Sequence, residues 1–320
     1  MFYRRILIVI TFFFGIFTSA IAQTWPNKPI KIITPAPPGG TTDFLARLFT
    51  QGTFSQPVIV EARPGASGNI GTDIVAKSAP DGYTLLMGAP GSLASNISLF
   101  KKLPFDPSKD LSPIILVAAV PLLVVAHPSV AASSVKELIE TLKANPLKYS
   151  YGSPGPGTPQ HLTAELFKNL TGTQLQHVPY KGSGQVVSDL LGGQIQIAFD
   201  AIVSLQSHAQ AGKIRALAVT SSEKSSAMMT TPTLSESGLP GFESTAWYGV
   251  VGPAGIPADI IARINGEMRR VLDLPETRAR IASIGSAPVH GSPEEFNSFI
   301  KAETLKWAKV IKDAGIHVAE

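Results

Sequence analysis

The residues best suited to bind a ligand lie where an apolar run meets a helical pattern. The stretch PAPPGGTTDFLAR, residues 35–47, follows IKIIT and brings two glycines, two threonines and an aspartate to the start of an expected helix. A helix N-terminus has free backbone N–H groups and attracts anions. Neither a Gly-Lys-Ser/Thr ending nor a G-x-G-x-x-G pattern is present in this stretch. We therefore expect an anion smaller than a nucleotide.

A second junction of the same kind lies in the middle of the chain. The stretch LKYSYGSPGPGTPQHLTAELF, residues 147–167, reads as a strand, a Gly/Pro loop and a helix with Thr158 as N-cap and Pro159 at its first position. Thr41 and Thr158 hold equivalent places in the two junctions. We expect the two loops to be halves of one anion site, each turning glycine backbone N–H groups and a threonine hydroxyl toward the ligand.

Patterns for catalysis or metal binding are weak in this chain. There is no G-x-S-x-G elbow and no H-E-x-x-H. The six histidines are scattered singly from His127 to His317, and adjacent Glu294 and Glu295 are typical of a helix start. We expect no catalytic residue, no metal and no cofactor. An exported α/β hydrolase or transferase acting on a small acid remains the alternative to a binding protein.

The N-terminus is typical of a secretory signal peptide. Arg4 and Arg5 precede an apolar run from Ile6 to about Phe17, and the A-x-A triplet ends at Ala22. A membrane anchor is the alternative, but the run is shorter than the ~20 residues that a span needs. We expect residues 1–22 to be removed by cleavage after Ala22 and the mature chain to be periplasmic.

Composition restricts the partners. The chain has no cysteine, which excludes a lipid-anchored lipoprotein and any disulfide, so stability has to come from a hydrophobic core. Charged residues make up 16%, against roughly 25% in typical domains, and no Lys/Arg block occurs. We expect a monomer that does not bind nucleic acid.

Apolar runs and helical patterns alternate along the chain as in an α/β protein with a mostly parallel sheet. The tract 113–126 is interrupted by Pro121, so we expect two strand segments that meet at a bend where the chain changes lobe. The expected first lobe comprises residues 23–120 and about 213–245. The expected second lobe comprises residues 121–212 and about 246–320, with a C-terminal helix able to pack back on the first lobe. Such discontinuous lobes joined by crossing strands form a hinge.

Five stretches together resemble one receptor family. They are PAPPGGTTDFLAR, ARPGASGNIGTDIVAKSAPDGYTLL, NPLKYSYGSPGPGTPQHLTAELF, HVPYKGSGQVVSDLLGGQIQIAFD and GKIRALAVTSSEKS. The chain is similar, from about Trp25 to the C-terminus, to the Bug-type extracytoplasmic solute-binding receptors of tripartite tricarboxylate transporters. The resemblance implies a type II periplasmic-binding-protein fold that closes on one small carboxylate. It also implies delivery of that solute to the integral-membrane permease subunits of the transporter.

The resemblance also implies a set of ligand-binding residues from both lobes. In the first lobe they are Gly39, Gly40, Thr41, Thr42, Asp43, Gly68 and Asn69. In the second lobe they are Ser153, Gly155, Gly157, Thr158, His161, Tyr180, Lys181, Gly182 and Asp200. The stretch 89–92, where the family varies, receives no assigned contact.

Four of these residues have equally plain structural interpretations. Asp43 could complement the dipole of its own helix, and Lys181 could be a solvated surface lysine. His161 could pack or cap at its helix start, and Asp200 could turn either its side chain or its backbone toward the cleft. The sequence leaves these alternatives open, together with the identity of the carboxylate and whether the docking partner is a transporter or a sensor.

Overall fold

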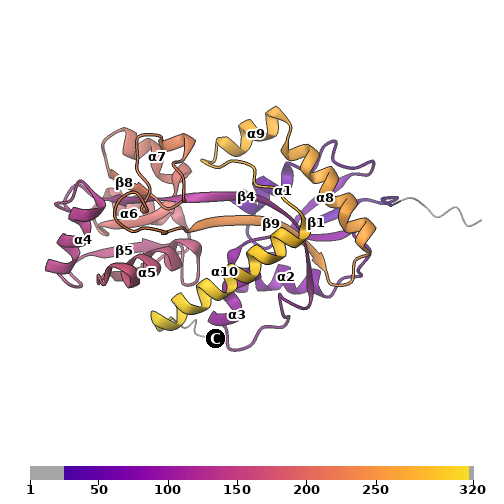
Figure 1. The fold of residues 1–320 in the computed structure, drawn as a ribbon, viewed down its shortest axis with the longest axis horizontal. Coiled ribbons are helices and arrows are strands. Elements are labelled where there is room, and N and C mark those ends of the chain that lie inside the picture. The colour runs from indigo at the N-terminus through magenta and orange to yellow at the C-terminus, as the bar shows by residue number, and fades with distance from the viewer. Residues whose placement is uncertain (1–24, 317–320) are drawn as a thin grey trace, which may run out of the picture.

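The structure is a computed structural model that describes residues 25–316. Nine strands of this range pair in the order β2-β1-β3-β9-β4-β7-β5-β6, and β8 also pairs with β4. They form two lobes that lie side by side and are bridged by two long strands (Figure 1). The expected signal peptide lies outside the described residues. Within them, no helix combines the length and apolar character needed to cross a membrane.

The first lobe is built on three parallel strands. Strand β1 lies between β2 and β3, as the apolar runs predict. The strands are β1 (Ile30–Thr34), β2 (Val58–Ala62) and β3 (Thr84–Gly88). Their helical elements are α1 (Thr41–Arg47), η1 (Ala66–Gly68), α2 (Asn69–Ala76), the π-helical turn η2 (Gly91–Ser95), α3 (Asn96–Leu99), α8 (Ala258–Leu272) and α9 (Pro275–Ala282).

The second lobe repeats the arrangement with a mixed sheet. Strand β5 pairs in parallel with β6 and β7, and β7 and β8 pair antiparallel with the end of β4. The strands are β5 (Ser150–Ser153), β6 (Gln176–Pro179), β7 (Ile197–Ala201) and β8 (Arg215–Val219). The helices are α4 (Val135–Ala144), α5 (Pro159–Thr171), α6 (Ser183–Leu191), α7 (Ile202–Gln210) and η3 (Ser226–Met228).

Two crossing strands connect the lobes. Strand β4 (Leu111–Ala126) pairs with β9 (Thr245–Pro253) up to Pro121, and from Leu122 onward it pairs with β7 instead. The expected bend at Pro121 is therefore a change of partners within one continuous strand. Proline is tolerated there because neighbouring pairings end at this point. Helix α10 (Pro293–Asp313) lies across this junction and touches β4, α5 and η2 (Figure 1).

The expected division between the lobes is wrong for the two later segments. Strand β8 pairs with β4 beyond Pro121, and Leu217 and Ala218 are buried in the second-lobe core. Helix α8 instead packs Ile264 and Met268 into the first-lobe core. The chain leaves the second lobe only at β9, so residues 215–219 belong to the second lobe and α8 to the first. The sequence pattern located the strands and the lobe boundary near residue 246, but it assigned the segments on the two sides of this boundary to the wrong lobes.

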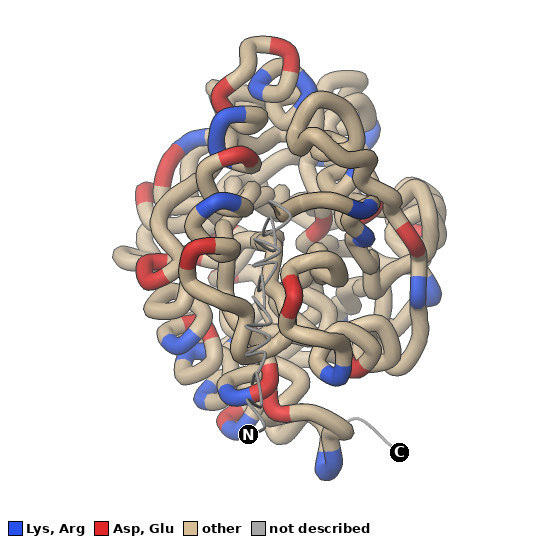
Figure 2. The backbone as a smooth tube through the Cα atoms, turned by 90° about the vertical axis from the view of Figure 1, so that its right-hand side faces the viewer, with Lys and Arg blue, Asp and Glu red and all other residues tan. Residues whose placement is uncertain are grey.

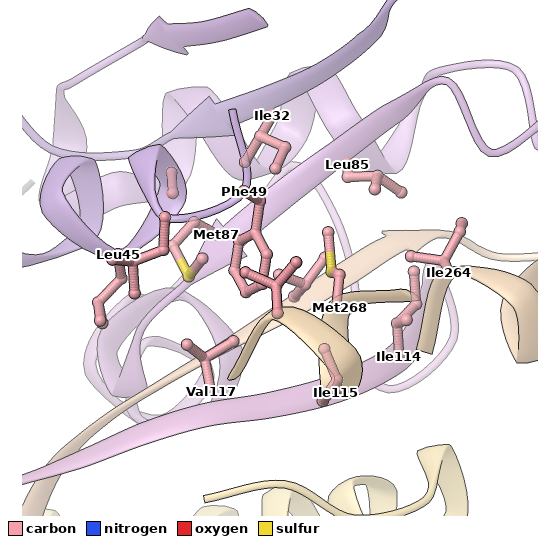
Figure 3. Packing of buried hydrophobic residues seen from close by; sticks show 14 of the residues in the cluster. Ile32, Leu45, Phe49, Leu85, Met87, Ile114, Ile115, Val117, Ile264 and Met268 are labelled. Carbon is pink, nitrogen blue, oxygen red and sulfur yellow. The ribbon is translucent and has the colours of Figure 1, made fainter. Parts of the chain in front are cut away.

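The first-lobe core joins segments from both ends of the chain. Phe49 and Met87 meet Ile115 of β4 and Met268 of α8 (Figure 3). Each fully buried side chain of this size contributes about 1.5–3 kcal/mol of transfer free energy. Because the C-terminal helices supply part of this core, the lobe is complete only after β9 has crossed back.

Serine side chains cap the starts of α10 and α4. Ser292 and Glu295 form the full capping box of α10. Ser134 caps α4, but the Glu137 carboxylate accepts the N–H of Ser133 instead of that of Ser134. The sequence patterns missed α7 and the helical turns between residues 91 and 99.

Gly249 of β9 provides a test of how closely β9 packs against β4 and α10 where the chain crosses between the lobes. On β9 an added Cβ would collide with the Phe296 ring of α10 and the Ile115 carbonyl of β4. We expect Gly249→Ala to destabilise the chain by about 1–3 kcal/mol through overpacking. The control, Gly266→Ala on the exposed face of α8, has open space and should stabilise by about 0.5–1 kcal/mol. Urea unfolding of both variants measures the difference, and equal midpoints would contradict the packing described for the crossing.

Candidate functional site

A cavity of about 600 Å³ lies between the two lobes. Its walls come from three first-lobe segments, residues 35–42, 64–68 and 89–96, and two second-lobe segments, residues 154–159 and 180–181. The three first-lobe segments follow β1, β2 and β3, whose carboxyl ends meet at one edge of the sheet. The two Gly/Pro loops predicted to share one site thus line the same cavity.

Seven of the sixteen predicted ligand-binding residues line this cavity. They are Thr42, Gly68, Gly155, Gly157, Thr158, Tyr180 and Lys181. The structure places the other nine next to the lining or behind it. They are Gly39, Gly40, Thr41, Asp43, Asn69, Ser153, His161, Gly182 and Asp200.

Asp43 shapes the first loop. Its carboxylate accepts two hydrogen bonds from Arg47, at 2.9 and 3.0 Å, and one from the N–H of Gly39 at 3.1 Å. Gly39 has φ +83°, which favours glycine. The hydrogen bond from Arg47 lowers the pKa of Asp43 below its ordinary value. The carboxylate is therefore ionised, and its hydrogen bonds are made to Arg47 and Gly39 of its own segment.

The second and third first-lobe segments are tied together by two asparagines. Asn96 donates from Nδ2 to Asn69 Oδ1 at 2.7 Å and to the Ser67 carbonyl at 3.1 Å. Both donors of the amide are thus used, and its Oδ1, which is buried, has no partner. Asn69 thus braces the start of α2 against the start of α3.

Two hydroxyls of the first lobe are buried at the cavity without a hydrogen-bond partner. Thr42 and Ser92 are 4% and 2% exposed, both line the cavity, and neither Oγ1 of Thr42 nor Oγ of Ser92 is bonded. The cavity lining also includes Ser67, Ser92 and Asn96, which the predicted set of ligand-binding residues lacks. The stretch 89–92, which contains Ser92, had received no assigned contact because the family varies there. Ser67 follows the carboxyl end of β2, and Ser92 and Asn96 follow that of β3, and this position is the signal that could have found them.

The second-lobe loop differs from its expected role. The N–H of Gly155 donates to Ser153 Oγ at 3.2 Å, and the N–H of Gly157 donates to His161 Nδ1 at 3.0 Å. These N–H groups point back into their own lobe, so the prediction that they face the ligand is wrong. The side chains of Ser153 and His161 accept these N–H groups because both side chains are buried directly behind the loop. The cavity instead meets Pro154, Pro156 and Pro159.

Thr158 and the segment around Tyr180 complete this wall. Thr158 donates from Oγ1 to the Gly155 carbonyl at 2.7 Å and caps α5, as predicted. The Tyr180 hydroxyl donates to Asp189 at 2.7 Å, and burial together with this bond raises the pKa of Tyr180 to about 12. Lys181 is exposed. Among the described residues that line the cavity, its side chain is the only charged one.

Asp200 lies behind the start of α6. Its Oδ1 accepts from Gln160 at 3.0 Å, Ser183 at 2.9 Å and the N–H of Ala201 at 2.7 Å. Its Oδ2 is buried and has no partner. Burial raises the pKa of this carboxyl above its ordinary value. Asp200 thus orders Gln160 and Ser183, two residues adjacent to the cavity.

A serine–histidine pair in this wall does not form a usable nucleophile. Ser153 Oγ lies 2.7 Å from His177 Nε2, a distance suited to general-base activation. The serine is fully buried and its hydroxyl also accepts the N–H of Gly155. A solute in the cavity would meet the proline side of the loop instead.

Comparison with known proteins identifies the family. Residues 46–316 match the family model described as tripartite tricarboxylate transporter family receptor. The chain belongs to this receptor family. It is 38% identical over 318 residues to protein BugT of Bordetella pertussis, with 97% of this chain and 98% of BugT covered. Membership agrees with the resemblance inferred from the five stretches.

Solved receptors of this type share the fold. An R. palustris protein with adipate is 35% identical with TM-score 0.81, covering 92% of this chain and 100% of that one. The periplasmic binding protein BugD is 31% identical with TM-score 0.77, at the same coverages. MatC from Rhodopseudomonas palustris with bound malate is 29% identical with TM-score 0.77, covering 90% and 100%. The predicted two-lobed periplasmic-binding-protein fold is confirmed.

Asp43→Asn tests the structural role of the first-loop carboxylate. At pH 7 we expect a loss of about 1–3 kcal/mol of unfolding free energy, because Arg47 loses an ionised partner and Gly39 a charged acceptor. The lowered pKa of Asp43 means that its contribution is present above about pH 3.9 and is lost as the pH falls through the lower folded value. The two unfolding curves should therefore converge as the pH falls below about 4.

The control is Asp73→Asn, which removes a partly exposed ion pair with Lys77 on α2. Such a pair is worth well under 1 kcal/mol. A loss for Asp43→Asn no larger than that of the control would show that the loop does not depend on this carboxylate.

Proposed function

We propose that this receptor captures a small carboxylate-bearing solute between its lobes in the periplasm and delivers it to the membrane permease subunits of a tripartite transporter. Membership of the receptor family supports the general role. Relatives that carry adipate and malate support the ligand class. The observation in this chain that carries the proposal is the pair of buried, unpartnered hydroxyls of Thr42 and Ser92 at the interlobe cavity.

These two hydroxyls are suited to an anion. Buried polar groups are almost always hydrogen-bonded, so two orphans on one cavity wall indicate a missing partner. A hydroxyl can donate to a carboxylate oxygen, and a hydrogen bond to a charged group contributes about 1.5–3 kcal/mol. The starts of α2 and α6 add backbone donors, because no side chain caps either helix.

The wall contains no buried cation in the described range to balance the anion. Lys181 lies exposed at the cavity, and the Arg47 guanidinium is committed to Asp43. Three or four neutral donors suffice for a micromolar ligand, about −8.2 kcal/mol, after association costs. We therefore expect affinity to fall only mildly with salt, since no ion pair has to be screened.

The two lobes have different shares in this proposal. The first lobe supplies the orphan hydroxyls of Thr42 and Ser92 and the acceptor Oδ1 of Asn96, which suits a hydroxyl, an amine or a bridging water. The second lobe covers the solute with the proline face of its loop, Thr158 and Lys181. Of the remaining predicted residues, we assign Asp43, Asn69, Ser153, His161 and Asp200 to shaping these walls.

The enzyme alternative is weaker. The hydroxyl nearest a histidine nitrogen in the cavity walls is that of Ser153, and it is buried behind Gly155. A receptor returns its solute unchanged, whereas a hydrolase or transferase would consume it. Mass spectrometry of the solute after prolonged incubation separates the two functions.

For export, we propose that the mature chain begins at Gln23. The A-x-A triplet after a short apolar run motivates this boundary. N-terminal sequencing of protein from the periplasmic fraction should read Gln23 first. An uncleaved chain in the membrane fraction would contradict export by a signal peptide.

A thermal-shift panel tests the ligand class. We expect at least one mono-, di- or tricarboxylate to raise the melting temperature without being consumed. At about 100 times its dissociation constant, a ligand that binds only the folded state adds about 2.7 kcal/mol. Each kcal/mol corresponds to roughly 2–4 °C for domains of 150–250 residues. Sugars or cations that shift the midpoint while every carboxylate fails would overturn the proposal.

Variants then locate the site with the carboxylate that gives the largest shift. Thr42→Val and Ser92→Ala should each weaken binding about tenfold to a hundredfold, the loss of one hydrogen bond to a charged group. Thr53→Val is the matched control, because Thr53 is also buried with an unpartnered Oγ1 but does not line the cavity. Calorimetry should give an unchanged affinity for this control. Equal losses in all three variants would mean that the cavity is not the site.

A further inference from the structure

Two stacked imidazoles lie behind the second-lobe loop. His161 is in the first turn of α5 and His177 is on β6, and their ring centroids are 4.1 Å apart with 16° between the planes. Tyr151 of β5 stacks on the same pair, at 4.9 Å from His177. His161 is 5% exposed. The cavity lining includes neither histidine, so the pair has no direct part in the proposed contact with the solute.

Each ring holds the loop through a different nitrogen. His161 accepts the N–H of Gly157 at Nδ1, 3.0 Å away. His177 Nε2 meets Ser153 Oγ at 2.7 Å, and this oxygen accepts the N–H of Gly155 at 3.2 Å. The two glycines have φ +129° and +78°, conformations that glycine adopts readily and residues with a Cβ rarely do.

The loop has few other backbone donors with which to hold its shape. The loop contains Pro154 and Pro156 and ends at Pro159, none of which has an N–H to donate. In the described structure, the N–H groups of Gly155 and Gly157 are bonded to side chains and not to backbone carbonyls. The shape of the wall therefore depends on the residues behind it.

The held loop also contacts the opposite lobe. A Cβ added to Gly157 would lie 2.6 Å from Leu99 Cδ1 of α3, so this glycine packs directly against the first lobe. Leu162, one residue after His161, is buried in a cluster with Leu99. The conformation of residues 153–158 thus decides how closely the lobes meet beside the cavity.

We propose that the His161–His177 pair is a positioning device that holds residues 153–158 in the shape in which the second lobe closes over the solute. His161 acts through Nδ1, and His177 acts through Nε2 and Ser153. That the loop closes over a solute rests on the proposed function, whereas the contacts of the two histidines with the loop do not. The device gives a role to His177, which the ligand-binding set did not include.

The device requires a neutral His161. A protonated Nδ1 would face the N–H of Gly157 donor to donor, so acid favours the open loop. The charged groups near the pair are Glu165 and Lys168 of α5, joined at 2.6 Å, and Tyr151 donates to Glu165 at 2.5 Å. Burial, His177 and Lys168 lower the pKa of His161 to about 3. While the loop keeps its hydrogen bond to His161, the imidazole stays neutral. When that bond is broken and the ring is exposed, His161 takes up a proton near pH 6.5.

Isosteric substitutions test each nitrogen separately. The oxygen of Asn occupies about the place of Nδ1, and the end of Gln that of Nε2. We expect His161→Asn and His177→Gln to retain slow amide exchange in residues 153–158 and in the facing residues 96–100. We expect His161→Gln and His177→Asn to lose protection in both segments by tenfold or more. Hydrogen exchange read by mass spectrometry measures this without any ligand, and His208→Asn on α7 is the control.

A pH series separates positioning from simple packing. After correction for intrinsic exchange, loop protection in the unmodified chain should fall below pH 6.5 relative to His161→Asn by up to about tenfold per pH unit. Circular dichroism verifies the fold of each variant. Equal protection in all four variants, or the same pH slope in His161→Asn, would overturn the proposal. Because no solute enters the measurement, failure of the proposed carboxylate function would leave this result intact.

Discussion

The pairing of β4 with β9 is the constraint on which the rest of the molecule depends. One strand serves two sheets, because β4 holds β9 up to Pro121 and then continues between β7 and β8. The segment where β4 changes partners is therefore the point at which the first-lobe sheet meets the second-lobe sheet. Every wall of the interlobe cavity is attached to one side or the other of this junction, so its geometry sets how the walls meet (Figure 1).

In both walls, side chains behind a Gly/Pro loop accept its backbone N–H groups, but the two loops present different groups to the cavity. In the first lobe, Asp43 and Asn69 satisfy the loop from within and leave the hydroxyls of Thr42 and Ser92 unpartnered at the cavity. In the second lobe, Ser153 and His161 consume the glycine N–H groups and leave prolines outward. One wall thus offers polar recognition and the other offers shape. A clamp of this kind needs only one lobe to recognise the anion chemically.

Charge plays a small part in the site. Acidic and basic residues are interspersed over the face shown in Figure 2, without a large field of one sign. The ionised Asp43 is neutralised by Arg47, and the buried Asp200 and His161 have pKa values shifted by burial toward their neutral forms. The interior around the cavity therefore consists of neutral dipoles, which recognise an anion through directed hydrogen bonds with little dependence on salt.

The sequence by itself determined the strands, most helix starts and the two Gly/Pro loops, because periodicity, caps and turn residues act over a few neighbouring positions. It also placed both loops on one site, because the two strand–loop–helix junctions match and hold Thr41 and Thr158 in equivalent places. Only the tertiary structure decided that β8 belongs to the second lobe, that Ser92 and Asn96 enter the cavity, and that His161 faces the loop instead of the solute. Those outcomes depend on which distant groups become neighbours after packing. A backbone N–H donates to the acceptor that burial places beside it, and that acceptor is fixed by the fold and not by the local sequence.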